Sequence, residues 1–164
     1  MRTRGSLALL VALMGGLSGC VSIVDVVDRD LSLPEAKAYT QSIEREIVEA
    51  MPGELVNAVE QKETGTFLAC SRGGGEQWAG GLTAEARPGV LPDELMGNIE
   101  EHFSDKADMS VSRRVEDEDS LVDIAGPHSS FWIVRYDPVR AEIRIVSFSP
   151  CIYLPEDVWR GDKY

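Results

Sequence analysis

The chain has 164 residues, of which 43% are hydrophobic, and its 28 acidic side chains outnumber 16 basic ones, for a net charge of −12. This excess of negative charge repels nucleic acid and anionic lipid headgroups, so neither is expected as a partner. It would suit a basic protein or a cation, and it also keeps a small protein soluble.

The N-terminal segment has the pattern of a secretory signal. Arg2 and Arg4 precede an apolar run over residues 7–14. The run is too short for a helix that spans a bilayer, but a basic start followed by such a run is typical of an export signal. Leu17-Ser18-Gly19-Cys20 follows it. An ordinary secretory signal with an incidental cysteine is the alternative interpretation.

This order of basic start, apolar run and Leu-Ser-Gly-Cys resembles the signal and lipobox of bacterial lipoproteins. The resemblance implies that residues 1–19 are removed and that Cys20 receives a diacylglyceryl thioether. Two acyl chains hold a protein stably at a membrane. It therefore implies an extracytoplasmic protein anchored to the cell membrane through Cys20, with 145 residues and a net charge of −14 after cleavage.

The mature chain is expected to consist of a tether, residues 20–33, and a single domain, residues 34–164. The domain is long enough to bury about two-thirds of its unfolded surface. Val21–Val27 is more apolar than a usual linker. The pattern leaves open whether this stretch forms a strand or only a tether.

A helix is predicted over residues 34–51. Ser32 and Glu35 have the spacing of a capping box, and Pro34 fits the first helical turn. One face is apolar and is expected to join the core: Ala36, Tyr39, Ile43, Ile47 and Ala50. The opposite face is expected to meet solvent: Glu35, Lys37, Gln41, Glu44, Arg45 and Glu49.

Two strands are predicted around a glycine-rich segment, over residues 66–71 and 77–87. In the second strand Trp78, Leu82 and Ala84 alternate onto one face. The segment between them, residues 72–76, lacks the lysine and the Ser/Thr of a phosphate-binding loop. Since glycine supplies the positive φ of tight turns, this segment is predicted to be the turn of a hairpin.

A second helix is predicted from Leu91 to about Phe103. Strands follow over residues 109–115, 130–136 and 141–148, with Asp137-Pro138 turning between the last two. This order of elements predicts an α+β fold: an antiparallel sheet of about five strands with two helices packed on one face.

Cys70 and Cys151 are predicted to form a structural disulfide. If Cys20 is lipidated, they are the remaining thiols in an oxidising compartment, where thiols pair. They do not form a redox C-x-x-C motif, and two cysteines cannot complete a zinc site. A bridge that closes a loop of about 80 residues contributes about 4.5 kcal/mol in the chain-entropy model.

Few residues have a pattern typical of catalysis. His102 lies in the second helix, and His128 lies in a Gly-Pro-His-Ser-Ser loop without a G-x-S-x-G motif. The acidic run 116–119, with Asp123 nearby, lacks the glycine and glutamate of an EF-hand and is expected to be a solvated loop. No catalytic, cofactor-binding or metal-binding residue is predicted.

The tryptophans have different expected roles. Trp78 and Trp132 lie on predicted strands and are expected in the core. Trp159 lies in a polar tail and is the candidate for an exposed contact.

The lipobox, the first helix, "LACSRGGGEQWAGG" and "SPCIYLPE" together resemble small LppA-like cell-surface lipoproteins of actinobacteria, which mostly have no assigned activity. The expected function is therefore that of a non-catalytic surface lipoprotein that binds an envelope protein or ligand or supports the envelope. The alternative is an envelope hydrolase, whose two carboxylates would lie about 5–5.5 Å apart in a cleft. The 28 acidic residues do not single out such a pair.

Overall fold

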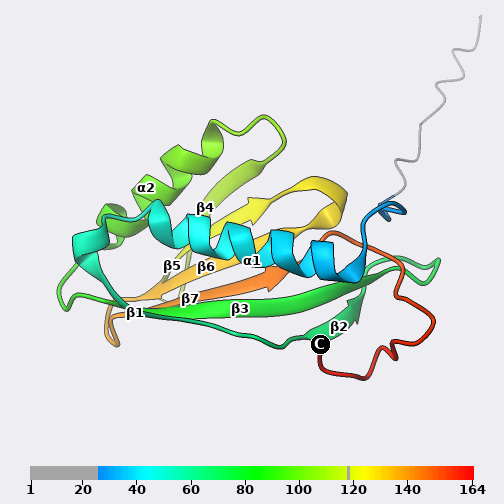
Figure 1. The fold of residues 1–164 in the computed structure, drawn as a ribbon. Helices are drawn as coiled ribbons and strands as arrows, with labels where there is room; N and C mark the ends of the chain where they lie inside the picture. The colour runs from blue at the N-terminus through cyan, green and yellow to red at the C-terminus, as the bar shows by residue number, and fades with distance from the viewer. Residues whose placement is uncertain (1–25, 118) are drawn as a thin grey trace, which may run out of the picture.

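The structure is a computed structural model that describes residues 26–117 and 119–164. The predicted signal, Cys20 and the start of the predicted tether lie outside the described residues. The elements are α1 (Leu33–Glu49), β1 (Val56–Gln61), β2 (Thr66–Ala69), β3 (Glu76–Ala86), α2 (Pro92–Ser104), β4 (Ser110–Glu116), β5 (Asp119–Ala125), β6 (Phe131–Asp137) and β7 (Glu142–Phe148). Figure 1 shows their arrangement. Of the described helices, neither is long and apolar enough to cross a membrane.

The strands form one seven-stranded sheet in the order β1-β3-β7-β6-β5-β4, with β2 also paired to β3. Every pair of named strands is antiparallel. The long strand β3 pairs with β2 over its first half and with β1 over its second half. The predicted α+β class and the two helices are confirmed. The expectation of about five strands was too low, because β1 and β5 were missed.

Both missed strands lack the alternation by which a half-buried strand is recognised. The strand β1 is a largely exposed edge strand, and its register shifts between Asn57 and Val59, where Ala58 has φ 34°. The strand β5 has buried side chains on both of its faces. Val122 and Ile124 belong to the main core, while Leu121 is buried on the opposite face of the sheet.

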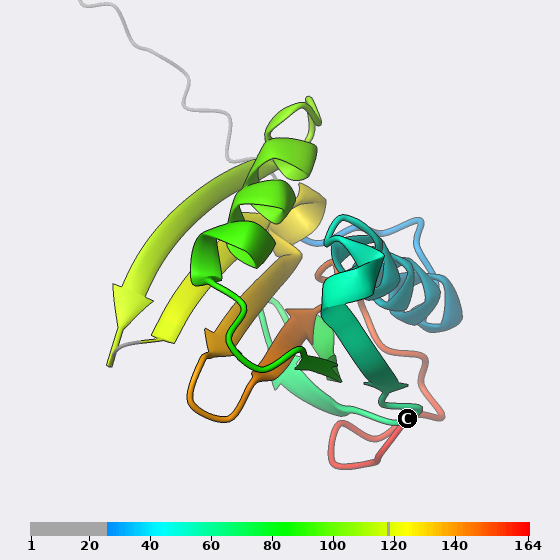
Figure 2. The ribbon, with the colours of Figure 1, turned by 90° about the vertical axis from the view of Figure 1, so that its left-hand side faces the viewer.

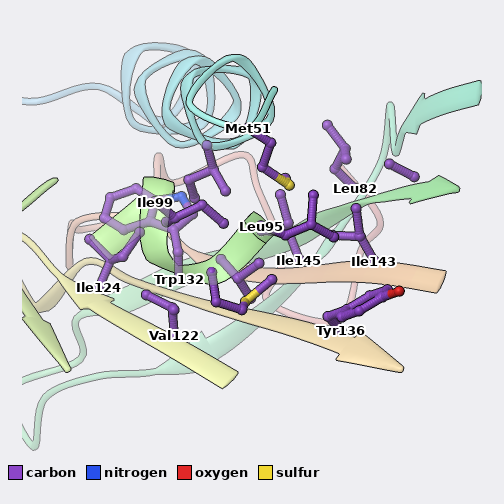
Figure 3. Close-up of a cluster of buried hydrophobic side chains, with 14 of the residues drawn as sticks. Met51, Leu82, Leu95, Ile99, Val122, Ile124, Trp132, Tyr136, Ile143 and Ile145 are labelled. Atoms are coloured by element: carbon purple, nitrogen blue, oxygen red, sulfur yellow. The ribbon is translucent and has the colours of Figure 1, made fainter. Parts of the chain in front are cut away.

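Both helices cover the same face of the sheet, and no helix among the described residues covers the other (Figures 1 and 2). The helix α1 lies over β3 and β7, and α2 lies over β4 and β5. The main core between them is shown in Figure 3 and includes Ile47, Leu95, Ile99, Trp132, Tyr136 and Ile145. Two polar atoms of its aromatic side chains are hydrogen-bonded to the backbone: Trp132 Nε1 donates to Thr40 O (3.2 Å) and Tyr136 Oη to Val90 O (3.0 Å).

The first helix begins as predicted. Glu35 Oε2 accepts hydrogen bonds from the amide (3.0 Å) and the hydroxyl of Ser32. The predicted apolar face is buried at Ala36, Ile43 and Ile47. The expectation that Glu44 faces solvent is wrong, because β1 and β7 both approach this side of α1 and bury it.

A second, smaller core lies under the first turns of α1. It contains Leu33, Ala36, Phe67, Trp78 and Ile152. Segments from both ends of the described chain meet here, since Leu31 and Tyr164 pack against this cluster. Trp78 Nε1 donates to Tyr164 O at 2.8 Å.

The register defines two ends of the sheet. At one end, here called the disulfide end, lie the β2–β3 turn (70–75), the β5–β6 connection (126–130) and the segment that follows β7 (149–152). At the other end, called the hairpin end, lie the β4–β5 and β6–β7 turns, marked by Asp117 and Val139.

Candidate functional site

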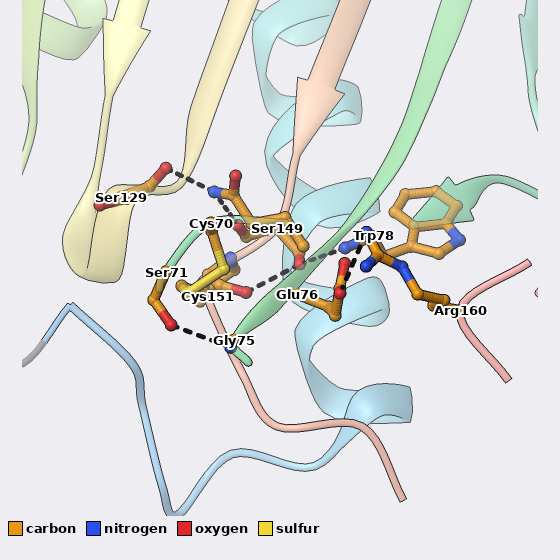
Figure 4. The surroundings of a disulfide bond; sticks show 11 residues. Cys70, Ser71, Gly75, Glu76, Trp78, Ser129, Ser149, Cys151 and Arg160 are labelled. Atoms are coloured by element: carbon orange, nitrogen blue, oxygen red, sulfur yellow. Dashed lines mark hydrogen bonds and ion pairs between the residues drawn. A yellow bond between two sulfur atoms is a disulfide. The ribbon is translucent and has the colours of Figure 1, made fainter. Parts of the chain in front are cut away.

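The disulfide end is built around the predicted bridge, which is present between Cys70 and Cys151 with a Cα–Cα distance of 5.9 Å. Cys70 follows β2 and Cys151 follows β7, and these strands lie on opposite sides of β3. The bridge therefore ties together two strands that β3 separates. Figure 4 shows the surroundings of the bridge.

The glycine-rich segment is a turn between β2 and β3, as predicted. Cys70 N donates to Gly75 O (2.9 Å), Gly75 N donates to Ser71 Oγ (2.9 Å), and Gly74 has φ +90°. A Cβ added at Gly75 would lie 2.7 Å from Cys151 Sγ and 2.9 Å from Val27 Cγ2. Glycine is needed here for backbone conformation and for close packing against the bridge.

The first described residues are fixed to this end. Val27 is 5% exposed, and Asp28 N donates to Cys151 O at 2.7 Å. Asp28 also forms an isolated parallel bridge with Ile152. Asp28 Oδ1 accepts hydrogen bonds from the amides of Asp30 and Leu31. From Val27 onward, residues of the predicted tether are thus packed on the folded domain.

The loop that carries His128 has an unusual backbone. His128 (φ 50°) and Ser129 (φ 64°) both occupy the left-handed region, which costs a non-glycine residue about 1 kcal/mol or more. Two hydrogen bonds hold them there: Cys151 N donates to His128 O (2.8 Å) and Gln77 Nε2 to Ser129 O (2.7 Å). The strained loop therefore positions Cys151.

The His128 side chain is 41% exposed and lies 3.6 Å from a carboxylate oxygen of Asp28. The neighbouring Ser130 is bonded elsewhere, since its hydroxyl donates to Pro127 O at 2.7 Å. Among the described residues no hydrogen bond joins His128 to a serine. The contacts therefore do not assemble a nucleophilic triad.

A groove of about 560 Å³ lies between α1 and α2 and brings together residues that are far apart in the sequence. Glu46 Oε1 lies 2.7 Å from His102 Nε2 and 2.6 Å from Lys106 Nζ. Burial by itself raises the pKa of Glu46, but the hydrogen bonds from Lys106 and His102 outweigh it and lower the pKa below its ordinary value. The carboxylate is therefore ionised and paired. Because α1 and α2 are far apart in the chain, no local pattern predicts this cluster.

Two other carboxyl groups are buried. Glu44 accepts hydrogen bonds from Ser147 Oγ and from Gln61 Nε2 (2.6 Å), and burial raises its pKa. Glu76 is 7% exposed; its Oε1 lies 3.4 Å from Arg160, and its Oε2 has no hydrogen-bond partner among the described residues.

These two carboxyl groups are engaged with different partners, at different positions along β3. Ser147, the partner of Glu44, pairs with Gly80. Gly80 lies four residues from Glu76 along β3, a distance of about 13 Å. The hydrolase alternative, which needs two carboxylates about 5–5.5 Å apart in a cleft, stays a prediction.

The acidic run 116–119 is exposed at Glu116 and Asp117, as expected for a solvated segment, but it is a tight hairpin turn and not a longer loop. Its described residues end β4 and begin β5, with Asp117 (φ 52°) in the turn. Asp119 and Glu116 lie 2.9 Å and 3.2 Å from the guanidinium of Arg135, while Asp123 lies 2.7 Å from Arg114. Neighbouring strands supply these arginines, so the charges are paired. No metal-binding group of three or more His, Cys, Asp or Glu residues occurs in the described part of the chain.

The tryptophans lie where the sequence placed them. Trp78 and Trp132 are fully buried, and Trp159 is 69% exposed. The exposed ring of Trp159 precedes Arg160, the partner of Glu76.

Comparison with known proteins identifies no relative. No family model, no curated protein and no solved structure matches the chain. The likeness to bacterial lipoproteins and to LppA-like surface proteins stays a prediction from the residues that carry it.

Proposed function

We propose that the protein is a lipoprotein anchored through Cys20 at the extracytoplasmic face of the cell membrane. Its single α+β domain binds an envelope protein or ligand, or supports the envelope, without catalysing a reaction. The basic start, apolar run and Leu-Ser-Gly-Cys of residues 1–20 support the anchor.

One observation supports the binding role: the carboxyl groups that could act as a catalytic acid or base are already paired with other side chains. Glu46 is paired with His102 and Lys106 in an open groove. The buried carboxyl groups of Glu44 and Glu76 have separate partners. A catalytic acid or base needs access to a substrate and a pKa suited to its task, and these contacts favour a structural role instead.

The uncovered face of the sheet offers area for binding. Strands β6 and β7 place Phe131, Ile133 and Val146 on this face, next to Arg135 and Arg144. Val146 is 37% exposed, and Phe131 and Ile133 are half-buried. Apolar groups beside charged ones are typical of the core and the rim of a protein interface.

The anchor is tested by replacing the thiol that would carry the lipid. The Cys20→Ala protein is expected to be released from membranes or to remain an uncleaved precursor. Mass spectrometry of the wild-type N-terminal peptide should show a diacylglyceryl group on Cys20. A Cys20→Ala protein that is still processed and bound to the membrane would contradict the proposal.

The binding role is tested by pull-down from detergent-solubilised membranes with the wild type and an Ile133→Asp variant. A component that the wild type retains intact and the variant loses supports binding at the open face. Exposed Val139, at the hairpin end, provides the control Val139→Asp, which should retain the component. Recovery of the component as cleaved fragments would favour the hydrolase instead.

A further inference from the structure

The proposed anchor lies close in sequence to a rigid point of the domain. Six residues, 21–26, lie between Cys20 and Val27, the first of the described residues that is buried, so seven Cα–Cα steps join the two. A fully extended chain of seven residues spans at most about 25 Å. The eleven residues of β3 extend for about 36 Å along the sheet. The segment from Cys20 to Val27 is therefore shorter, even when fully extended, than the domain is along β3.

The connection is fixed to one end of the sheet only. Asp28 N donates to Cys151 O, and His128 O accepts from Cys151 N, so Cys151 joins the start of the described chain to the β5–β6 connection. The disulfide adds Cys70 and the β2–β3 turn to the same unit. These bonds make the disulfide end a rigid platform, in contrast to a flexibly linked domain.

From these observations, and resting on the proposed lipid anchor, we infer that the disulfide end is a membrane-facing surface that lies against the lipid headgroups. The hairpin end then points away from the bilayer. The surface consists of Val26, Arg29, Arg72, His128 and Tyr153, which the sheet register and the following contacts place together.

The contacts across this surface are continuous. The Arg29 guanidinium lies 5.6 Å from the centre of the Tyr153 ring. A Cβ added at Gly73, next to Arg72, would lie 3.8 Å from Tyr153 Oη. His128 reaches Asp28, the neighbour of Arg29. Figure 4 shows how the turns of this end meet around the bridge.

The chemistry of the surface suits a headgroup layer. Tyr153 is 42% exposed, and a tyrosine ring with a polar tip is favoured where lipid meets water. Val26 adds an exposed apolar group, and the exposed Arg72 supplies a guanidinium that can pair with lipid phosphate. Glu116, Asp117 and Asp119 lie at the opposite end of the sheet, whereas Asp28 and Asp30 lie beside the basic groups of this surface. The surface therefore carries charges of both signs, as zwitterionic headgroups do.

The inference is tested with the full-length lipidated protein in phosphatidylcholine vesicles that contain a headgroup-spin-labelled phosphatidylcholine. Arg72→Cys and Val139→Cys each add one thiol for a fluorophore. The native cysteines do not compete, because Cys70 and Cys151 are bonded and Cys20 is expected to be a thioether. Both positions are exposed turn residues, at the disulfide end and at the hairpin end.

The spin label quenches only nearby fluorophores, so quenching is expected to be several-fold stronger at position 72 than at position 139. The difference should vanish when both proteins are held in detergent without the labelled lipid. Equal quenching, or stronger quenching at position 139, overturns the inference while the anchor stands. Mass spectrometry of the same samples separates the two proposals, since unmodified Cys20 contradicts the anchor itself.

Discussion

Replacing Cys70 or Cys151 is expected to lower the free energy of unfolding by about 4.5 kcal/mol. The cysteines are 81 residues apart in sequence, and in the chain-entropy model a cross-link over such a loop restricts the unfolded chain by this amount. Domains of this size are stable by only about 5–15 kcal/mol. The bridge therefore supplies a large share of the stability.

The two positions are not equivalent in their surroundings. Cys151 is fully buried, whereas Cys70 is half-buried. A serine at position 151 places a hydroxyl in an apolar site, which costs a further ~1–3 kcal/mol if it finds no partner. Cys151→Ser should therefore be less stable than Cys70→Ser. The double variant should lose little more than Cys151→Ser alone, because each replacement removes the same cross-link.

The assay is urea unfolding of the oxidised wild type, the reduced wild type and the three variants. The reduced wild type is the matched control, because it loses the bond and keeps both sulfur atoms. It should unfold at a urea concentration close to that of Cys70→Ser. If oxidised and reduced wild type unfold at the same midpoint, the bridge does not stabilise the domain. Two alkylatable thiols at positions 70 and 151 in the secreted protein would refute the reasoning more directly.

Three further predictions concern the core. Burial raises the pKa of Glu44, so the folded state binds its proton more tightly than the unfolded state, and ionisation costs stability as the pH rises through the folded pKa. Glu44→Gln should therefore stabilise the protein at pH 7, and urea unfolding should show the gain shrinking as the pH falls toward the ordinary pKa of 4.5; a gain unchanged by pH would contradict this origin. Gly81→Ala should destabilise the domain by several kcal/mol, because the new Cβ would lie 2.4 Å from Ile145 O in the centre of the sheet. An unchanged melting temperature would contradict this, since it would mean that β3 and β7 move apart without cost. Trp132→Ala should lower the free energy of unfolding by about 3–5 kcal/mol. Replacement of the exposed Trp159 by alanine should change it by less than about 0.5 kcal/mol, as measured by calorimetry. Similar losses for the two variants would mean that the C-terminal segment unfolds together with the core.

Much of the fold follows from local patterns in the sequence. The capping residues Ser32 and Glu35 predict where α1 begins, and the alternation from Trp78 to Ala86 predicts which face of β3 is buried. The glycines at 73–75 predict a turn, because a left-handed backbone is a local demand on residue type, whereas the close packing of Gly75 against Cys151 depends on the fold. The Cys70–Cys151 pair followed from the number of cysteines and the expected compartment.

Other features depend on what surrounds a segment. The edge position of β1 and the two-sided burial of β5 remove the alternation that would reveal them. Glu44 is a polar residue on a predicted solvent face, yet β1 and β7 enclose it and supply its hydrogen bonds. A residue's burial is decided by the elements that pack against it, and the helical pattern alone does not contain them.

Of the candidate functional residues, too, some can be predicted from the sequence and others are brought together only by the fold. The residues of the proposed anchor can be read from the first 20 positions, since an export signal is a contiguous stretch of chain. The Glu46, His102 and Lys106 cluster and the membrane-facing surface join residues from segments far apart in sequence. Strand pairing sets the end of the sheet at which each connection lies. The antiparallel register brings the 126–130 loop and Cys151 to one end and the acidic turn to the other, and a parallel bridge to Ile152 adds Asp28 to the first.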